Sequence, residues 1–98
     1  MTTVRRRIVI SGLVQGVAFR YYTRAKAREA GATGWVKNLP DGRVEALIEG
    51  SFSVVEEVIR WCRKGPPASR VDDIKIYEEP ATGEFSEFDI NYAGGRFW

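Results

Sequence analysis

The sequence predicts an α+β fold in which two helices pack on one face of an open, mainly antiparallel sheet. Two observations support this prediction. Segments in which apolar residues alternate, as in half-buried strands, are interspersed with segments in which they recur at helical spacing. Their order along the chain is β-α-β-β-α-β with a terminal fifth strand, which is the order of a ferredoxin-like split β-α-β sandwich. Right-handed crossovers then bring both helices to the same face of the sheet.

Each strand and helix is indicated by its own periodicity. In the first strand, Ile8 and Ile10 lie on one face, and in the first helix Phe19, Thr23 and Ala27 recur at helical spacing. The expected elements are, in order, a strand at Val4–Ser11, a helix at Phe19–Ala30, strands at Thr33–Asn38 and Arg43–Glu49, a second helix, and strands at Val71–Glu78 and Glu84–Tyr92.

The second helix is the most clearly marked element. Ser53 and Glu56 have the spacing of a capping box, so we expect the helix to begin at Ser53. From Val55 onward its apolar residues recur at i, i+3, i+4 and i+7, and the Gly-Pro-Pro sequence at Gly65 ends it. Cys62 is the last residue of this apolar stripe, which indicates a core residue rather than a nucleophile.

Composition excludes several classes of protein. The chain has 98 residues and a net charge of +2, too little to indicate nucleic-acid binding, and it has no apolar stretch of membrane-spanning length or secretory signal. It contains one cysteine and no histidine, which excludes an internal disulfide, a multi-cysteine metal site and imidazole chemistry. We expect a cytoplasmic monomer with one domain over residues 1–98, a core at about 4–92, and a C-terminal tail at 93–98 whose role the sequence does not indicate.

A glycine-containing loop joins the first strand to the first helix. The segment Gly12–Arg20 reads Gly-Leu-Val-Gln-Gly-Val-Ala-Phe-Arg, and successive backbone N–H groups at such a junction can converge on one anion. Arg20 adds a planar fork of hydrogen-bond donors. The positive end of the helix dipole disfavours a cation at this place, so the Arg20 charge is better explained if an anion lies between the guanidinium and the helix N-terminus. A nucleotide-type loop would need Gly-Lys followed by Ser or Thr, which does not follow Gly16. The loop therefore predicts a site for a phosphoryl group.

The same loop resembles the signature of the acylphosphatase family, Gly-x-Val-Gln-Gly-Val-x-Phe-Arg, at every fixed position. Further family elements match at Gly34–Asn38 (Gly-Trp-Val-x-Asn), Asp41–Val44 (Asp-Gly-x-Val) and Gly65–Ala68 (Gly-Pro-Pro-Ala), so the resemblance runs from about Val4 to Tyr92. One position departs mildly: many members have glycine where this chain has Ala18. Alanine disfavours a positive φ, so we expect a slightly stiffer loop that retains activity.

The resemblance implies hydrolysis of acyl phosphates to a carboxylate and inorganic phosphate, with Arg20 and Asn38 as the catalytic residues. Asn38 would position the attacking water, since its side chain both donates and accepts hydrogen bonds. The carboxylate leaving group departs without protonation, which suits a chain without histidine. The resemblance implies no cofactor and no metal, and inorganic phosphate would be both product and inhibitor. The phosphate-binding loop would comprise the backbone of Gln15, Gly16, Val17, Ala18, Phe19 and Arg20.

Three other functions remain open at this stage. The chain could be a non-catalytic phosphate-binding regulatory module, although Asn38 argues against it because binding alone needs no residue that positions water. RNA-recognition modules share the split topology, but the strand Arg43–Glu49 carries no aromatic residue on which a base could stack. The third alternative is an accessory domain of a larger carbamoyl-phosphate-handling maturation protein, which the short chain and its lack of paired-cysteine zinc motifs disfavour.

Overall fold

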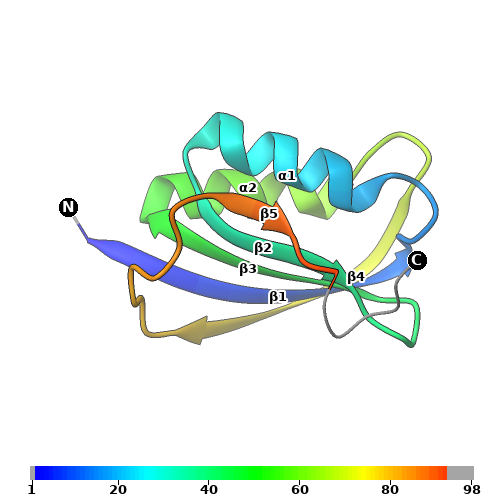
Figure 1. Cartoon of the computed structure of the whole chain (residues 1–98). Helices are drawn as coiled ribbons and strands as arrows, with labels where there is room; N and C mark the ends of the chain where they lie inside the picture. The colour runs from blue at the N-terminus through cyan, green and yellow to red at the C-terminus, as the bar shows by residue number, and fades with distance from the viewer. Residues whose placement is uncertain (1, 93–98) are drawn as a thin grey trace.

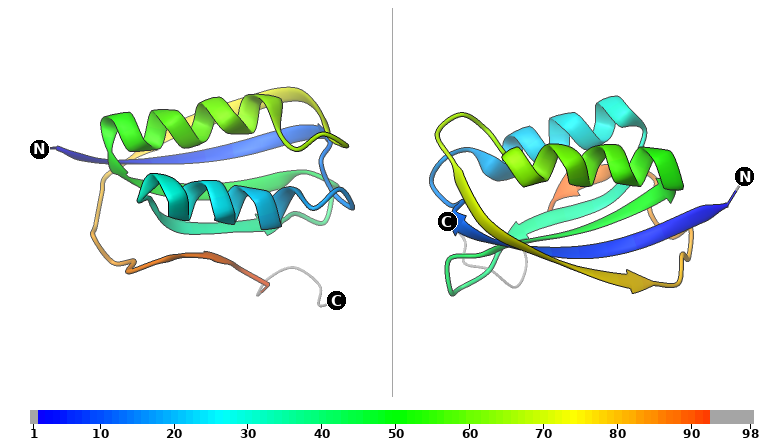
Figure 2. Two further views of the ribbon diagram at one scale, coloured as in Figure 1. Left: turned by 90° about the horizontal axis from the view of Figure 1, so that it is seen from above. Right: turned by 180° about the vertical axis from the view of Figure 1, so that it is seen from behind.

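The computed structural model describes residues 2–92, in which two helices cover one face of a single five-stranded sheet (Figures 1 and 2). The predicted fold class and order of elements are confirmed. The predicted C-terminal tail, residues 93–98, lies outside the described residues. The elements are β1 (Thr3–Leu13), α1 (Phe19–Ala30), β2 (Thr33–Asn38), β3 (Val44–Ser51), α2 (Phe52–Lys64), β4 (Arg70–Glu79) and β5 (Phe88–Ile90).

The strand order in the sheet is β4-β1-β3-β2-β5. β1 pairs antiparallel with β3 and β4, and β2 pairs antiparallel with β3, whereas β5 pairs parallel with β2. The sheet is therefore mainly antiparallel, as predicted. Because β5 runs in the same direction as β2, both strands end near the start of α1, as Figure 1 shows.

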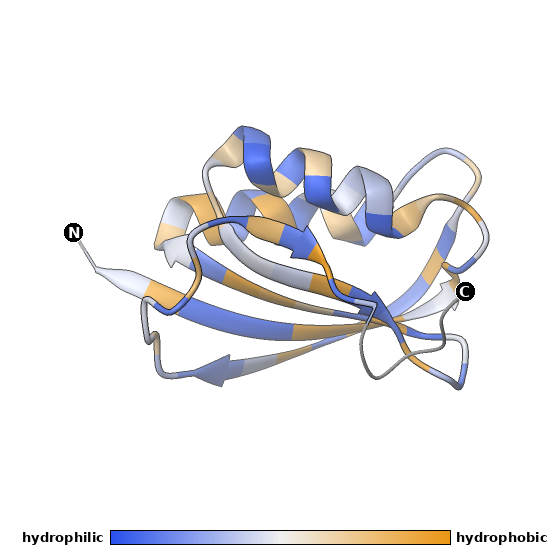
Figure 3. Ribbon diagram, in the orientation of Figure 1, coloured by the Kyte–Doolittle hydropathy of each residue, from blue (hydrophilic) through white to orange (hydrophobic). Residues whose placement is uncertain are grey.

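The core lies between the helices and the sheet. β1 contributes Ile8 and Ile10, and α2 contributes a stripe that begins at Val55. Hydrophilic and hydrophobic segments alternate along the strands, as half-buried strands require (Figure 3). Cys62 is buried, and its burial raises the pKa of the thiol to about 12, which confirms the prediction of a core residue. Neither helix in the described part of the chain is long and apolar enough to cross a membrane.

The second helix begins earlier than its capping-box pattern predicts. Ser51 has an extended backbone, and its Oγ accepts a hydrogen bond from the N–H of Val54 at 3.4 Å, so Ser51 is the N-cap. The physical reason is that β3 ends at Ser51 and α2 follows without a loop, so the hydroxyl of the last strand residue caps the helix. Ser53 lies inside the first turn, and the predicted capping box with Glu56 is wrong.

The last strand is shorter than predicted: β5 comprises Phe88–Ile90 instead of Glu84–Tyr92. Among the described strands it pairs with β2 alone, and this ladder extends over three residues from Gly34 to Val36. One further backbone hydrogen bond flanks each end, from Gly34 N–H to Glu87 O at 3.0 Å and from Asn91 N–H to Val36 O at 2.8 Å.

A buried ionic cluster fixes the connection between β4 and β5. Glu49 is 2% exposed, and its carboxylate accepts the backbone N–H groups of Thr82 at 2.7 Å and Gly83 at 3.2 Å. Arg5 donates from Nη2 to Thr82 Oγ1 at 2.6 Å and to Glu84 Oε1 at 2.9 Å, and its Nε lies 3.4 Å from Glu49 Oε2. This cluster bends the chain away from β4 so that it reaches the far edge of the sheet as β5.

Candidate functional site

The loop between β1 and α1 is held by two anchors. Val14 is 1% exposed in the core, and the side-chain amide of Gln15 donates from Nε2 to Leu39 O at 2.8 Å and to Arg43 O at 2.9 Å. The Gln15 side chain therefore ties the loop to the turn between β2 and β3. Within residues 2–92, the backbone N–H groups of residues 15–18 donate no hydrogen bond. They remain free to bind an anion in front of the helix.

Left-handed backbone conformations shape the end of this loop. Gly16 has φ 77°, and Ala18, the N-cap of α1, has φ 64° and ψ 24°. Ala18 is the one non-glycine residue in the described range with a positive φ, and it caps the helix without a side-chain hydrogen bond. Alanine thus adopts the conformation that it disfavours, at a cost of about 1–2 kcal/mol.

One cavity of about 260 Å³ joins this loop to both predicted catalytic residues. It lies between the loop, the start of α1 and the ends of β2 and β5. Its lining residues are Val14, Gln15, Gly16, Ala18, Phe19, Arg20, Tyr21, Arg24, Asn38, Ile90 and Tyr92. Of the loop residues predicted to hold phosphate, only Val17 is outside this lining, because its side chain packs against the core.

Arg20 lies in the first turn of α1 with its side chain half-buried. Its guanidinium carbon is 5.4 Å from the centroid of the Tyr92 ring. Within residues 2–92, it forms no ion pair with any carboxylate, and no carboxylate lines the cavity. The cavity is consequently electropositive, with the Arg20 charge at the N-terminal end of the helix dipole and available to an anion.

Asn38 is the last residue of β2. Its side-chain Oδ1 is buried and accepts no hydrogen bond from the described residues. A buried acceptor of this kind is costly unless water or a ligand supplies the donor. The turn that follows Asn38 is closed by backbone and by Asp41, whose carboxylate accepts from the N–H of Arg43 at 3.1 Å. Asn38 is therefore not needed to close the turn, and it lines the cavity.

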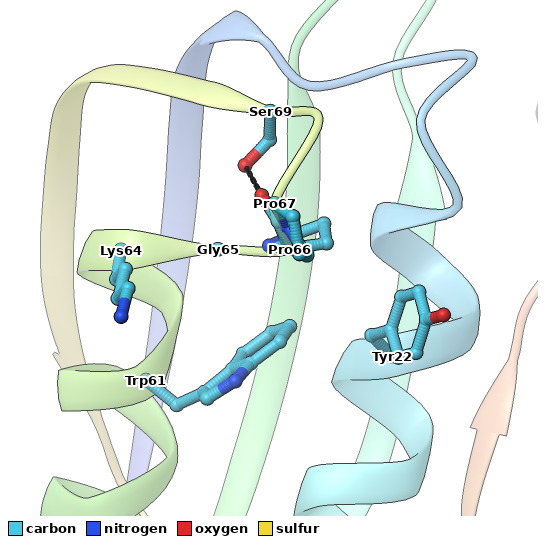
Figure 4. A pocket seen from close by; sticks show the side chains of 7 residues that line it. All are labelled: Tyr22, Trp61, Lys64, Gly65, Pro66, Pro67 and Ser69. Carbon is cyan, nitrogen blue, oxygen red and sulfur yellow. Dashed lines mark hydrogen bonds between the residues drawn. The ribbon is translucent and has the colours of Figure 1, made fainter.

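A second pocket, of about 610 Å³, lies between α1 and the end of α2 (Figure 4). In Figure 4 the indole of Trp61 faces the gap between the two helices, with Tyr22 across it. Ser69 Oγ donates to Pro66 O at 2.7 Å and so stabilises the turn that closes the pocket. This pocket is larger than the first, but none of the predicted site residues lines it, and Lys64 is the one charged residue among its lining residues in the range 2–92. The smaller cavity is therefore the candidate active site.

Sequence reasoning did not identify four residues that line this cavity: Tyr21, Arg24, Ile90 and Tyr92. Arg24 follows Arg20 by four residues, and that spacing on a helix was an available signal. Ile90 and Tyr92 reach the cavity only because β5 pairs parallel with β2, which no local pattern indicates.

Comparisons with known proteins show which family the chain belongs to. The family model described as Acylphosphatase matches residues 6–90. An acylphosphatase of Rubrobacter xylanophilus is 51% identical over 90% of this chain and 80% of its own length, and one of Aeropyrum pernix is 51% identical over 91% and 89%. The crystal structure of acylphosphatase from Bacillus subtilis superimposes with a TM-score of 0.87 at 38% identity, covering 91% of this chain and 99% of that one. The chain belongs to the acylphosphatase family of enzymes.

Proposed function

We propose that the chain hydrolyses acyl phosphates to a carboxylate and inorganic phosphate in the cavity between the loop, α1, β2 and β5. The observation that supports this most directly is the meeting of three features in one cavity. Within residues 2–92, they are the N–H groups of Gln15, Gly16 and Ala18, which donate no hydrogen bond, the guanidinium of Arg20, which forms no ion pair, and the unsatisfied Oδ1 of Asn38. The first two suit a phosphate, and the third suits a water molecule.

The phosphoryl group would bind at the N-terminus of α1. The backbone N–H groups from Gln15 to Arg20 and the Arg20 fork would hold its oxygens and stabilise the charge that they carry in the transition state. Phosphoryl transfer depends on positioning and charge stabilisation more than on covalent help. Gly16 and Ala18, with their positive φ values, would turn successive N–H groups toward the same anion.

Asn38 would position the nucleophile. Its Oδ1 would accept a hydrogen bond from a water molecule and so aim the water oxygen at phosphorus, opposite the leaving group. The oxygen–phosphorus bond forms as the bond to the acyl oxygen breaks, and the carboxylate leaves with the electron pair. The water proton passes to a phosphate oxygen, so the reaction needs no further base.

The reaction would be independent of metal. Arg20 and the loop amides supply the positive field that a metal ion supplies in many phosphoryl transferases. In addition, no group of three or more Asp, Glu or Cys side chains in residues 2–92 is placed to hold a metal ion. Turnover should therefore be unchanged by a chelator or by added magnesium, whereas inorganic phosphate and sulfate should inhibit competitively.

The decisive experiment compares Arg20→Lys with Arg20→Ala on acetyl phosphate, with release of phosphate as the readout. Both variants should lose kcat by roughly 10²–10³-fold, because lysine keeps the charge but lacks the fork that matches two phosphate oxygens. Arg63→Lys, an exposed position on α2, is the matched control and should keep the parent kcat. A near-normal kcat for Arg20→Lys would show that Arg20 acts only through its positive charge and that its forked geometry is not required. If the parent protein binds phosphate but does not hydrolyse acetyl phosphate, the result would instead indicate a non-catalytic phosphate-binding regulatory module.

A further inference from the structure

We propose that the cavity takes acyl phosphates whose acyl group carries a second negative charge, and that Arg24 binds that charge. This inference rests on the proposed hydrolysis of acyl phosphates and adds a substrate class to the same site. Nothing in the loop signature specifies the acyl group, because the loop and Arg20 face the phosphoryl end.

The basic residues of α1 fall into two groups. Two of them are neutralised by carboxylates from neighbouring elements, whereas Arg20 and Arg24 form no ion pair within residues 2–92. The neutralised residues are Lys26, with Nζ 2.9 Å from Glu57 Oε2, and Arg28, with Nη2 2.8 Å from Asp89 Oδ1. The two unpaired arginines of this helix are thus the same two that line the cavity.

Their spacing puts both guanidinium groups on one side of α1. Residues four apart lie on the same helical face, and Arg24 is roughly 6 Å farther along the axis than Arg20. Arg24 is half-buried, with its guanidinium carbon 5.8 Å from the centroid of the Tyr21 ring, as Arg20 lies 5.4 Å from that of Tyr92. Tyr21 and Tyr92 also line the cavity, so each charge is held against one of its aromatic residues.

The charge of the cavity favours a substrate with two anionic ends. A phosphoryl group bound by the loop and Arg20 leaves the Arg24 charge uncompensated in a space of about 260 Å³ that no carboxylate of residues 2–92 lines. A neutral acyl group would partly desolvate that charge without pairing it, which is unfavourable. A carboxylate at the far end of the acyl chain would bind the guanidinium with two parallel hydrogen bonds. Ile90 offers an apolar contact for the carbons between the two ends.

The test compares two substrates of equal chain length: adipoyl monophosphate, which has a free carboxylate at its far end, and hexanoyl phosphate, which has none. That carboxylate is ionised at neutral pH because its pKa is close to the value of about 4.3 for a glutamate side chain. The readout is the ratio of kcat/KM for adipoyl monophosphate to kcat/KM for hexanoyl phosphate. This ratio does not depend on the fraction of protein that is folded and active.

We expect Arg24→Gln to lower this ratio roughly tenfold, the scale of one lost charge-assisted contact. Arg24→Lys should give an intermediate ratio, since it keeps the charge without the fork. The matched control Arg63→Gln removes the same charge from α2 and should leave the ratio unchanged.

An equal ratio in the parent and in Arg24→Gln would overturn the proposal. So would an equal loss on both substrates together with weaker inhibition by inorganic phosphate, because Arg24 would then act on the phosphoryl group. If the parent hydrolyses neither substrate nor acetyl phosphate, the proposed function itself fails, and that result is distinct from a parent that is active but indifferent to the carboxylate.

Discussion

Replacing Ala18 with glycine should stabilise the protein. With φ 64° and ψ 24°, this alanine pays about 1–2 kcal/mol for a left-handed conformation that glycine adopts freely. Glycine also gives the unfolded chain more freedom, which offsets about 0.4–1 kcal/mol of the gain. The free energy of unfolding should therefore rise by about 0.5–1 kcal/mol. For a domain of this size, Tm should rise by roughly 2–8 °C.

The matched control is Ala25→Gly, an exposed position in the interior of α1. The same chemical change there should lower the free energy of unfolding by about 1 kcal/mol, since glycine is a poor helix former. The assay is urea denaturation of the parent and of both variants, with Tm from calorimetry. The predicted effects are opposite in sign. If Ala18→Gly destabilises the protein as much as Ala25→Gly does, the conformational argument for Ala18 is refuted.

Three further predictions concern single side chains. Asn38→Ala should lower kcat by roughly 10²–10³-fold yet keep the parent's thermal stabilisation by phosphate; loss of both would make Asn38 a binding residue. The raised Cys62 pKa means that only the unfolded state loses the thiol proton between about pH 9 and 12. Stability should fall there by up to about 1.4 kcal/mol per pH unit, and denaturation of Cys62→Ala should lack this component. Glu49→Ala should lower the free energy of unfolding by about 3–5 kcal/mol, because buried Arg5 loses one of its carboxylate partners and the N–H groups of Thr82 and Gly83 lose their acceptor; a loss below 1 kcal/mol would contradict this.

Much of the fold could be read from the sequence because its signals are local. The periodicity of Phe19–Ala30 and the glycine that follows it define α1 completely. The start of α2 could not be read in this way. Ser51 and Ser53 are both good caps, and the choice depends on where β3 ends. The extent of β5 could not be read from the sequence either, since it depends on pairing with Gly34–Val36 of β2, about fifty residues earlier in the chain.

The residues of the candidate site also fall into those that local sequence predicts and those that depend on the tertiary fold. The loop, Arg20 and Asn38 are marked by residue order alone, and the structure brings them into one cavity. Ile90 and Tyr92 enter that cavity through a parallel pairing between segments about fifty residues apart, which periodicity does not encode. The unpaired state of Arg24 is also non-local, because it depends on which carboxylates the fold brings near the other basic residues of α1.

The late position of β5 in the chain has a consequence for the order of assembly. A nascent chain that has emerged only as far as β4 already contains the anion-binding loop, Arg20 and Asn38, but it lacks Ile90 and Tyr92, which complete the cavity. That last strand is held by a three-residue ladder and by Arg28, which donates to Phe88 O at 2.9 Å. A ligand that needs the complete cavity can therefore bind only after the final strand docks. Such a ligand shifts the equilibrium between undocked and docked β5 toward the docked state, and so favours completion of the last folding step.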